Sequence, residues 1–384
     1  TEPLSLESLG FPRVSLGLLC TTTVRQGDTR DSGLAAAIEQ GLHIYNARRR
    51  FTWPGIAAVS VCSIHLKKGS VLKQRLLNGK HVDLITAYLL TQGDNRKPPV
   101  LAASTGYSYQ GTVIRGAGFL FDDAKEGATP VSIARKLLAE KPHYSSAIKE
   151  FIGGEDLLGS TNGRSSRFAI DLGECNKNEI HAFPELLEIV ERKVKTARES
   201  SKAKTSSGKV LSEWWKFSHR AENMYRAIQN KTRVIAAPQT STYHTFAFVP
   251  TNAILAQTLV VIDSDSLVLI GLLSSRAHEA WSLTHCSTLE DRPRYIPTDA
   301  FETFPFPFDL DTHPEELMNE YSIFGDLEDA PRGFISHREQ AMGKESITLS
   351  DYHNRLNSPM YNDTTSLAAR DLMDRLDQCV FQLY

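Results

Sequence analysis

The sequence predicts a mixed fold in three successive parts: the end of an α/β sheet, a β-rich α+β region and a small helical C-terminal region. Three observations support this prediction. A strand–helix–strand–strand pattern opens the chain, short strand-like runs separated by glycines follow from about residue 75, and helical segments rich in acidic residues dominate after residue 308. The 384 residues are 41% hydrophobic and 23% charged, as in ordinary soluble proteins. We therefore expect three domains, at 1–75, 76–308 and 309–384.

The first part reads as a short α/β unit. Residues 14–20 form an apolar run of strand length, and residues 32–38 have helical composition, with Gly41 as the expected C-cap. Residues 42–47 and 56–66 read as two further strands, and the second is apolar enough on both faces to suit a strand covered by helices on both sides. Four elements are too few for a whole doubly wound domain, so we interpret this part as the end of a larger sheet.

The remaining elements alternate between strands and helices. We expect a helix at 130–140. We also expect an amphipathic helix over 183–194, because apolar residues in that stretch recur at helical spacing. The polar stretch 200–209 reads as a loop. Four strands are expected at 233–237, 244–249, 258–263 and 267–273, followed by helices at 277–283, 315–324, 336–342 and 364–384.

Charge is distributed unevenly although the formal net charge is only −2. Residues 1–80 hold eleven Lys and Arg against five acidic residues, and residues 191–233 hold twelve against four. Residues 309–384 hold six against fifteen. A polyanion-binding protein needs a locally positive face, because screening limits each charge to about 8–10 Å of reach. The alternative is that these charges lie on solvated helical faces and an acidic tail.

Several classes of protein are excluded. No apolar run approaches the roughly 18 residues that cross a bilayer, so we expect no membrane span. Five scattered cysteines (Cys20, Cys62, Cys175, Cys286 and Cys379) argue against a disulfide framework and a zinc site, and fit a reducing cytoplasm. A Walker loop, GxGxxG after a strand, HExxH and GxSxG are absent, and we expect no metal. The chain begins at Thr1 without an initiator Met or a signal peptide, which indicates a truncated chain.

The segment 287–295 is a candidate for reading DNA bases. In an extended segment alternate side chains share a face, so Glu290, Arg292 and Arg294 would project together. A carboxylate accepts from the cytosine amino group, and guanidinium groups grip O6 and N7 of guanine in the major groove. The alternative is a ladder of surface salt bridges.

A second set of residues is a candidate for contacts with the DNA backbone. Trp214, Trp215, Phe217 and His219 mix aromatic rings with nearby cations, as stacking and backbone-binding surfaces do. Paired tryptophans also serve as a packing plug between domains, which is the alternative here. The cations proposed to contact phosphates are Lys193, Lys195, Lys202, Lys204, Lys209, Lys216 and Arg220.

Several stretches resemble the C-terminal part of the MmeI-like (type IIL, type IIG-related) adenine-specific DNA methyltransferase and restriction–methylation proteins, including related methyltransferases of phage-defence systems. The most specific are Trp53-Pro-Gly-Ile-Ala-Ala-Val59 and Phe301-Glu-Thr-Phe-Pro-Phe-Pro307. The others are 17–30, 151–156, 167–173, 183–190, 214–217, 278–281 and 287–294. Their order and spacing extend the resemblance from about residue 14 to the C-terminus.

The resemblance implies a layout and a chemistry. Residues 1–75 would be the last strands of a class I S-adenosylmethionine-dependent methyltransferase fold, 76–308 the DNA target-recognition domain, and 309–384 a helical domain. The glycine-rich donor loop and the Asn-Pro-Pro-aromatic catalytic motif are absent from this chain, so catalysis by the chain alone is not expected although the parent protein would be an enzyme. Trp53 would contact the adenine flipped out of the duplex, unless it is a core residue. Glu290, Arg292 and Arg294 match the segment that reads bases.

Two hypotheses follow. In the first, the chain supplies sequence recognition to a site-specific N6-adenine DNA methyltransferase of a restriction–modification or phage-defence system, with or without a fused nuclease. Its partners would be double-stranded DNA and the methyltransferase core with its S-adenosylmethionine. In the second, the chain is a non-catalytic DNA-binding or scaffold subunit that binds other subunits of a defence complex.

Overall fold

The computed structural model describes residues 15–54, 56, 59–69, 74–200, 213–289, 292–311 and 324–384. The chain forms two compact units, each built from two stretches of sequence. The first unit combines Thr1–Leu101 with Ala280–Phe304, and the second combines Ala102–Glu279 with Pro305–Tyr384. The expected divisions lie after residues 75 and 308. In the structure the first unit extends to Leu101 and also includes Ala280–Phe304, and the second unit also includes Pro305–Tyr384.

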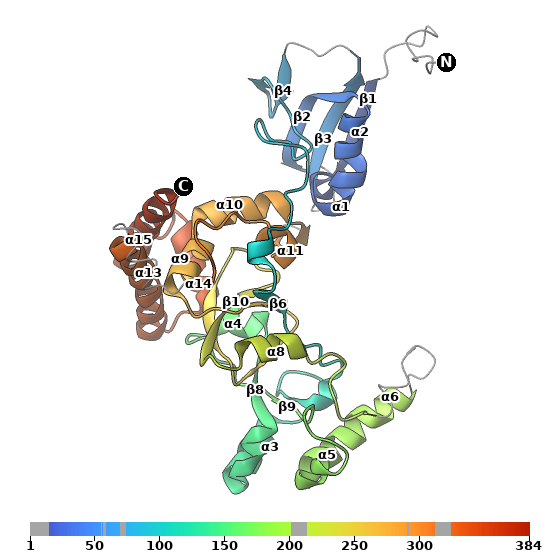
Figure 1. Cartoon of the computed structure of the whole chain (residues 1–384), viewed down its shortest axis with the longest axis vertical. Helices are drawn as coiled ribbons and strands as arrows, with labels where there is room; N and C mark the ends of the chain where they lie inside the picture. The colour runs from blue at the N-terminus through green and yellow to red at the C-terminus, as the bar shows by residue number, and fades with distance from the viewer. Residues whose placement is uncertain are drawn as a thin grey trace. The chain divides into compact units, whose positions relative to one another are not determined.

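The first unit contains a five-stranded sheet in the order β1-β3-β2-β4-β5. Its strands are β1 (Ser15–Thr21), β2 (Leu42–Thr52), β3 (Ser60–Lys68), β4 (Arg75–Leu77) and β5 (Lys80–Val82). Strand β3 is antiparallel to both β1 and β2, so β1 and β2 run parallel to each other. A helical connection joins them, made of α1 (Gly27–Arg30), a π turn and α2 (Ala36–Glu39) (Figure 1). The predicted strand–helix–strand–strand pattern is therefore confirmed.

The helical connection ends where the sequence predicts. The peptide N–H of Gly41 donates to the carbonyl of Ile38 at 2.9 Å, and Gly41 has a φ of +85°, which glycine adopts without a steric penalty. Strand β2 then begins at Leu42, as predicted, and extends five residues beyond the predicted end at Ala47.

Burial along β3 corrects one expectation. Cys62, Ile64 and Leu66 are fully buried, whereas Ser63 and His65 between them are half-buried. In the described part of the sheet, β3 is therefore fully buried along one face, and on the other face it is buried only at Val61. The apolar run of its sequence is interrupted by Ser63 and His65, and these two residues occupy the other face.

The first unit continues past residue 75 because β4 pairs with β2 at Asn46 and Ala47. It then takes in 280–304, which holds the end of α10 (Arg276–His285), the strands β14 (Thr288–Leu289) and β15 (Arg292–Pro293), and α11 (Pro297–Ala300).

The second unit contains two four-stranded sheets. One has the order β11-β10-β13-β6 and the other β12-β8-β9-β7. Their strands are β6 (Ser108–Gln110), β7 (Leu120–Phe121), β8 (Ile148–Ile152), β9 (Phe168–Ile170), β10 (Arg233–Pro238), β11 (Ala247–Pro250), β12 (Ile254–Leu255) and β13 (Leu259–Ile262). The predicted strands at 233–237, 244–249 and 258–263 are confirmed as β10, β11 and β13.

Helices surround these sheets. Those before residue 230 are α3 (Val131–Glu140), α4 (Gly154–Gly159), α5 (Pro184–Val190), α6 (Thr196–Ser200) and α8 (Glu222–Ile228). Helix α3 confirms the prediction at 130–140. The predicted amphipathic helix at 183–194 is confirmed as α5, which continues through a π turn at Glu191–Lys195 into α6. The predicted polar loop at 200–209 falls almost wholly outside the described residues.

The expected strand at 267–273 is wrong, because these residues form helix α9 (Leu267–Ser274). The hydroxyl of Ser266 accepts a hydrogen bond from the peptide N–H of Leu269 at 3.2 Å and caps the helix. A short apolar run buried on every side carries no periodicity that separates a helix from a strand, and the Ser266 cap was the signal that separates them here.

The C-terminal region packs on α9 (Figure 1). It consists of α13 (Phe324–Glu345), α14 (Leu349–Asn357) and α15 (Thr364–Phe381), so the predictions at 336–342 and 364–384 are confirmed and α14 was not predicted. Most of the helix expected at 315–324 lies outside the described residues. Phe334, Tyr352 and Leu376 form buried contacts among these helices. None of the helices in the described ranges has the length and apolar character that crossing a membrane requires.

Candidate nucleic-acid interface

The segment 287–295 is a β-hairpin and not the single extended strand that the sequence predicts. Leu289 pairs with Arg292, so the chain reverses direction between these two residues. Glu290, the third of the proposed base-reading residues, lies outside the described residues. The sequence 287–295 contains no dipeptide typical of a hairpin turn, such as Asn-Gly, so the turn could not be predicted.

The two arginines after the reversal do lie on a common side. Arg292 and Arg294 are exposed, whereas Tyr295 is 2% exposed. The hairpin is held in place by the peptide N–H and hydroxyl of Thr288, which lie 3.2 and 3.3 Å from Oε1 of Gln26. Exposed and covered side chains alternate in this strand, so the hairpin β14–β15 carries the two guanidinium groups at its surface.

Trp53 lies at the end of β2, in the loop that leads to β3. Its peptide N–H donates to the carbonyl of Val59 at 2.9 Å, which closes the loop. The side chains of Trp53, Ile56 and Val59 are 36%, 107% and 42% exposed. Trp53 is therefore not a core residue of the described structure, and its ring is accessible to a partner.

The described lysines proposed for DNA contacts have intramolecular partners. Nζ of Lys193 donates to the carbonyls of Gly127 and Ala128 at 3.0 and 2.6 Å, and burial together with Arg192 lowers its pKa. Lys195 forms an ion pair with Glu191, and Lys216 forms one with Glu213, both at 2.6 Å. Lys202, Lys204 and Lys209 lie outside the described residues.

Arg220 holds two segments of the second unit together. Its Nη2 lies 3.0 Å from Oδ2 of Asp171 and 2.8 Å from Oε1 of Glu174. Its guanidinium also lies 5.2 Å from the ring centre of Tyr225. The positive charge of Arg220 is therefore compensated within the chain by two carboxylates.

The paired tryptophans pack rather than protrude. Trp215 is 5% exposed and its Nε1 donates to the carbonyl of Cys175 at 3.3 Å. Phe217 is also buried and meets Phe119 edge to face at 5.1 Å. Trp215 and Phe217 therefore belong to the hydrophobic core of the second unit. Trp214 is half-buried, with Nζ of Lys195 5.2 Å from its ring.

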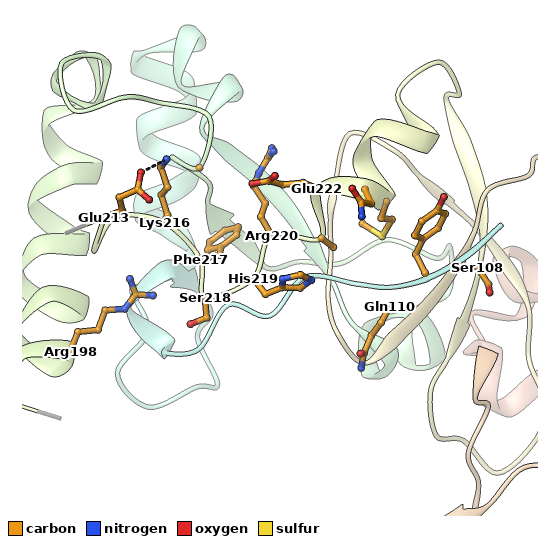
Figure 2. Close-up of a pocket in the computed structure, with 15 residues that line it drawn as sticks. Ser108, Gln110, Arg198, Glu213, Lys216, Phe217, Ser218, His219, Arg220 and Glu222 are labelled. Carbon is orange, nitrogen blue, oxygen red and sulfur yellow. Dashed lines mark ion pairs between the residues drawn. The ribbon is translucent and has the colours of Figure 1, made fainter. Parts of the chain in front are cut away.

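A cavity of about 650 Å³ opens beside these residues (Figure 2). Arg198 and the Glu213–Lys216 ion pair stand on one side, and Ser108 and Gln110 of β6 stand on the other. His219 extends into the space between them in Figure 2. The polar lining, with donors and acceptors on both walls, suits a polar ligand such as a nucleotide strand.

No sequence pattern indicates this cavity, because one wall comes from 108–110 and the other from Arg198 and the segment after residue 212. Ser108 and Gln110 were not singled out, and neither was Arg198. In the described part of the chain no group of three or more His, Cys, Asp or Glu residues is placed to hold a metal ion.

Comparison with known proteins supports the resemblance on which the sequence analysis rests. Residues 125–308 match the family described as MmeI, target recognition domain. Over 97% of its length the chain also matches the structure of the type IIL restriction-modification enzyme MmeI in complex with DNA, with a TM-score of 0.71 and 22% identity. The resemblance to MmeI-like proteins is thereby confirmed.

Other comparisons add less. The match covers 47% of MmeI, so this chain spans about half the length of that protein. The type IIG restriction endonuclease BpuSI matches with a TM-score of 0.35 and 10% identity, which is too weak to carry an argument. No curated protein sequence matches the chain.

Proposed function

We propose that this chain recognises a DNA sequence on behalf of a restriction–modification enzyme of the type IIL class. The observation that carries the proposal is the match of residues 125–308 to the MmeI target recognition domain. The matched structure of MmeI was solved with DNA, which makes double-stranded DNA the expected partner. Since the partner is DNA, we expect the protein to work in the cytoplasm.

Within this proposal the hairpin residues read bases. Arg292 and Arg294 are exposed on one side of a support that Gln26 anchors, as direct readout of guanine requires. Glu290 would accept from cytosine. Lys216 and Arg220 line the cavity of Figure 2 and would contact the DNA backbone there, together with the lysines of 193–209.

The proposal extends to the chemistry of the parent protein, which would transfer a methyl group from S-adenosylmethionine to N6 of a flipped adenine. The donor loop and the Asn-Pro-Pro-aromatic motif are absent from these 384 residues, and we assign no catalytic step to this chain. Two features support a link to such a core: β1 and β2 form the parallel part of an α/β sheet, and Trp53 is exposed after β2.

The test is selection of bound duplexes from a randomised DNA pool at near-physiological salt, without a methyl donor. We expect a defined asymmetric motif, and we expect Arg294→Met to relax one position of it at a cost of about 1–3 kcal/mol. Arg375→Met is the matched control, because it removes one positive charge from an exposed position on α15. Binding without a motif would contradict base reading by this chain, and no binding would favour the non-catalytic scaffold hypothesis.

A further inference from the structure

Three arginines gather at one edge of the first sheet. Thr21 of β1 and Phe51 of β2 both pair with Val61 of β3, so the parallel strands β1 and β2 end at the same level. Arg25 lies in the turn after β1, and Arg49 and Arg50 lie near the end of β2. All three residues are therefore close to the carboxyl edge of the sheet. In open α/β sheets this edge is where ligands bind.

Arg25 is buried there without a partner. The residue is 9% exposed, and its Nε and Nη1 are buried and have no hydrogen-bond partner. Burial, Arg49 and Arg50 together lower the pKa of its guanidinium to about 10, against a smaller opposing effect of the Cys62 thiol. A buried guanidinium with positive neighbours is costly unless an anion compensates it.

The cluster reaches from the interior to the surface. Arg49 is half-buried and Arg50 is exposed, with Nε of Arg50 3.2 Å from Oγ of Ser60. The backbone of Arg49 is fixed, because its N–H donates to Oδ1 of Asn78 at 2.8 Å and its carbonyl accepts from Sγ of Cys62 at 2.9 Å. Within the described ranges neither Arg25 nor Arg49 forms a salt bridge, so no carboxylate neutralises the charges of these two guanidinium groups there.

We propose that Arg25, Arg49 and Arg50 form an oxyanion site, and that in the DNA complex its occupant is a backbone phosphate. The inference rests on the proposed function. Guanidinium groups match the geometry of phosphate oxygens and donate to two of them at once. The exposed ring of Trp53 follows Arg50 by three residues, so the phosphate would belong to the nucleotide beside the base that meets Trp53.

The test compares Arg25→Met and Arg49→Met with the control Arg375→Met in the full chain. In buffer without oxyanions, Arg25→Met should raise Tm, because it removes a buried charge that nothing compensates. Inorganic phosphate should raise Tm of the native chain and of the control, and this rise should be lost in both cluster variants. For duplex DNA, each cluster variant should bind about tenfold more weakly, with a plot of log affinity against log salt less steep by about 0.9.

The outcomes separate the claims. A fall of Tm in Arg25→Met with an unchanged response of both variants to phosphate would overturn the oxyanion site and make Arg25 a structural residue. If the cluster variants lose the response to inorganic phosphate but keep the salt dependence of DNA binding, the site does not bind a DNA backbone phosphate. The site would then bind a free anion. If the native chain does not bind DNA, the proposed function fails, and the phosphate measurements still decide whether the oxyanion site exists.

Discussion

Nε of Arg167 lies 2.9 Å from Oδ1 of Asp156, and its Nη1 lies 3.1 Å from Oδ2 of Asp122. This contact joins two segments that the resemblance to MmeI-like proteins singled out, 151–156 and 167–173. Asp156 also accepts from the peptide N–H of Gly153 at 2.7 Å. Arg167 therefore ties the first turn of helix α4 to the start of strand β9, and its side chain is 21% exposed.

Arg167→Met should destabilise the chain by about 3 kcal/mol, because it leaves the carboxylates of Asp122 and Asp156 without their shared cation in a poorly solvated place. Urea unfolding measures the change. Lys136→Met is the control: Lys136 and its partner Glu140 are 67% and 55% exposed, and exposed pairs contribute little. Equal effects of the two substitutions would contradict this account.

Gly271→Ala should cost about 1–3 kcal/mol in the free energy of unfolding. A Cβ at this position of α9 would lie 2.7 Å from Cβ of Pro331 and 3.3 Å from Cδ1 of Leu376, so α13 and α15 would have to move. Gly343→Ala in α13 meets no atom within 4 Å and should stabilise by about 0.5–1 kcal/mol. Opposite signs of the two changes, measured in the same denaturant series, confirm the close approach of these helices.

Acid should weaken the second unit through its buried histidines. Burial lowers the pKa of His278 and of His353 to about 3, with smaller effects of His244 on the first and Arg338 on the second. The unfolded chain binds protons below about pH 6.5 whereas the native imidazoles stay neutral, so stability falls as the pH falls from about 6.5 towards 3. Each histidine contributes about 1.4 kcal/mol per pH unit in that window.

His353→Phe should lose less stability on acidification than the original chain, because one of the buried histidines is gone. Urea unfolding at pH 7, 6 and 5 measures the free energy of unfolding of both. His181→Gln is the control, because solvent reaches His181 in the native as well as in the unfolded state. A pH dependence unchanged in His353→Phe would show that other groups cause the loss.

Trp53→Ala should cost less free energy of unfolding than the about 3–5 kcal/mol that truncation of a fully buried tryptophan costs, because 36% of the residue is exposed. If the ring meets a base, the same substitution should weaken DNA binding by about 1–3 kcal/mol and remove part of the DNA-dependent quenching of tryptophan fluorescence. A large loss of stability with unchanged quenching would assign Trp53 a packing role.

Lys216 and Glu213 should change DNA affinity in opposite directions. Lys216→Met removes one positive charge from the lining of the cavity and should weaken binding to every duplex alike. Glu213→Gln releases Lys216 and should strengthen binding equally for all sequences. Filter binding to the selected duplex and to a scrambled one measures both effects, and a change in the ratio between the two duplexes would contradict a backbone contact.

Predictions from the sequence succeeded where the signal was local. The helix before Gly41 needed only a glycine at its end, and α3 needed only ten residues of helical periodicity. They failed where a local pattern has two structural solutions: the apolar run at 267–273 became helix α9, and the charged run at 287–295 became a hairpin.

The candidate site divides in the same way. Alternation within β15 and the residue after it places Arg292 and Arg294 on one side, as the sequence predicts, and the exposure of Trp53 follows from its position in a loop. The partners of Lys193 could not be read from the sequence, because the carbonyls of Gly127 and Ala128 lie more than 60 residues away along the chain.

The sequence by itself determined the order of elements, the uneven distribution of charge and the resemblance to a DNA target-recognition protein, since these depend on composition and on spacing along the chain. Only the tertiary structure decided which charges are neutralised and which are not. Arg167 and Arg220 find carboxylates across the fold, whereas Arg25 is buried without one. The physical reason is that an ion pair requires two side chains within about 4 Å. Packing, and not separation in the sequence, sets that distance.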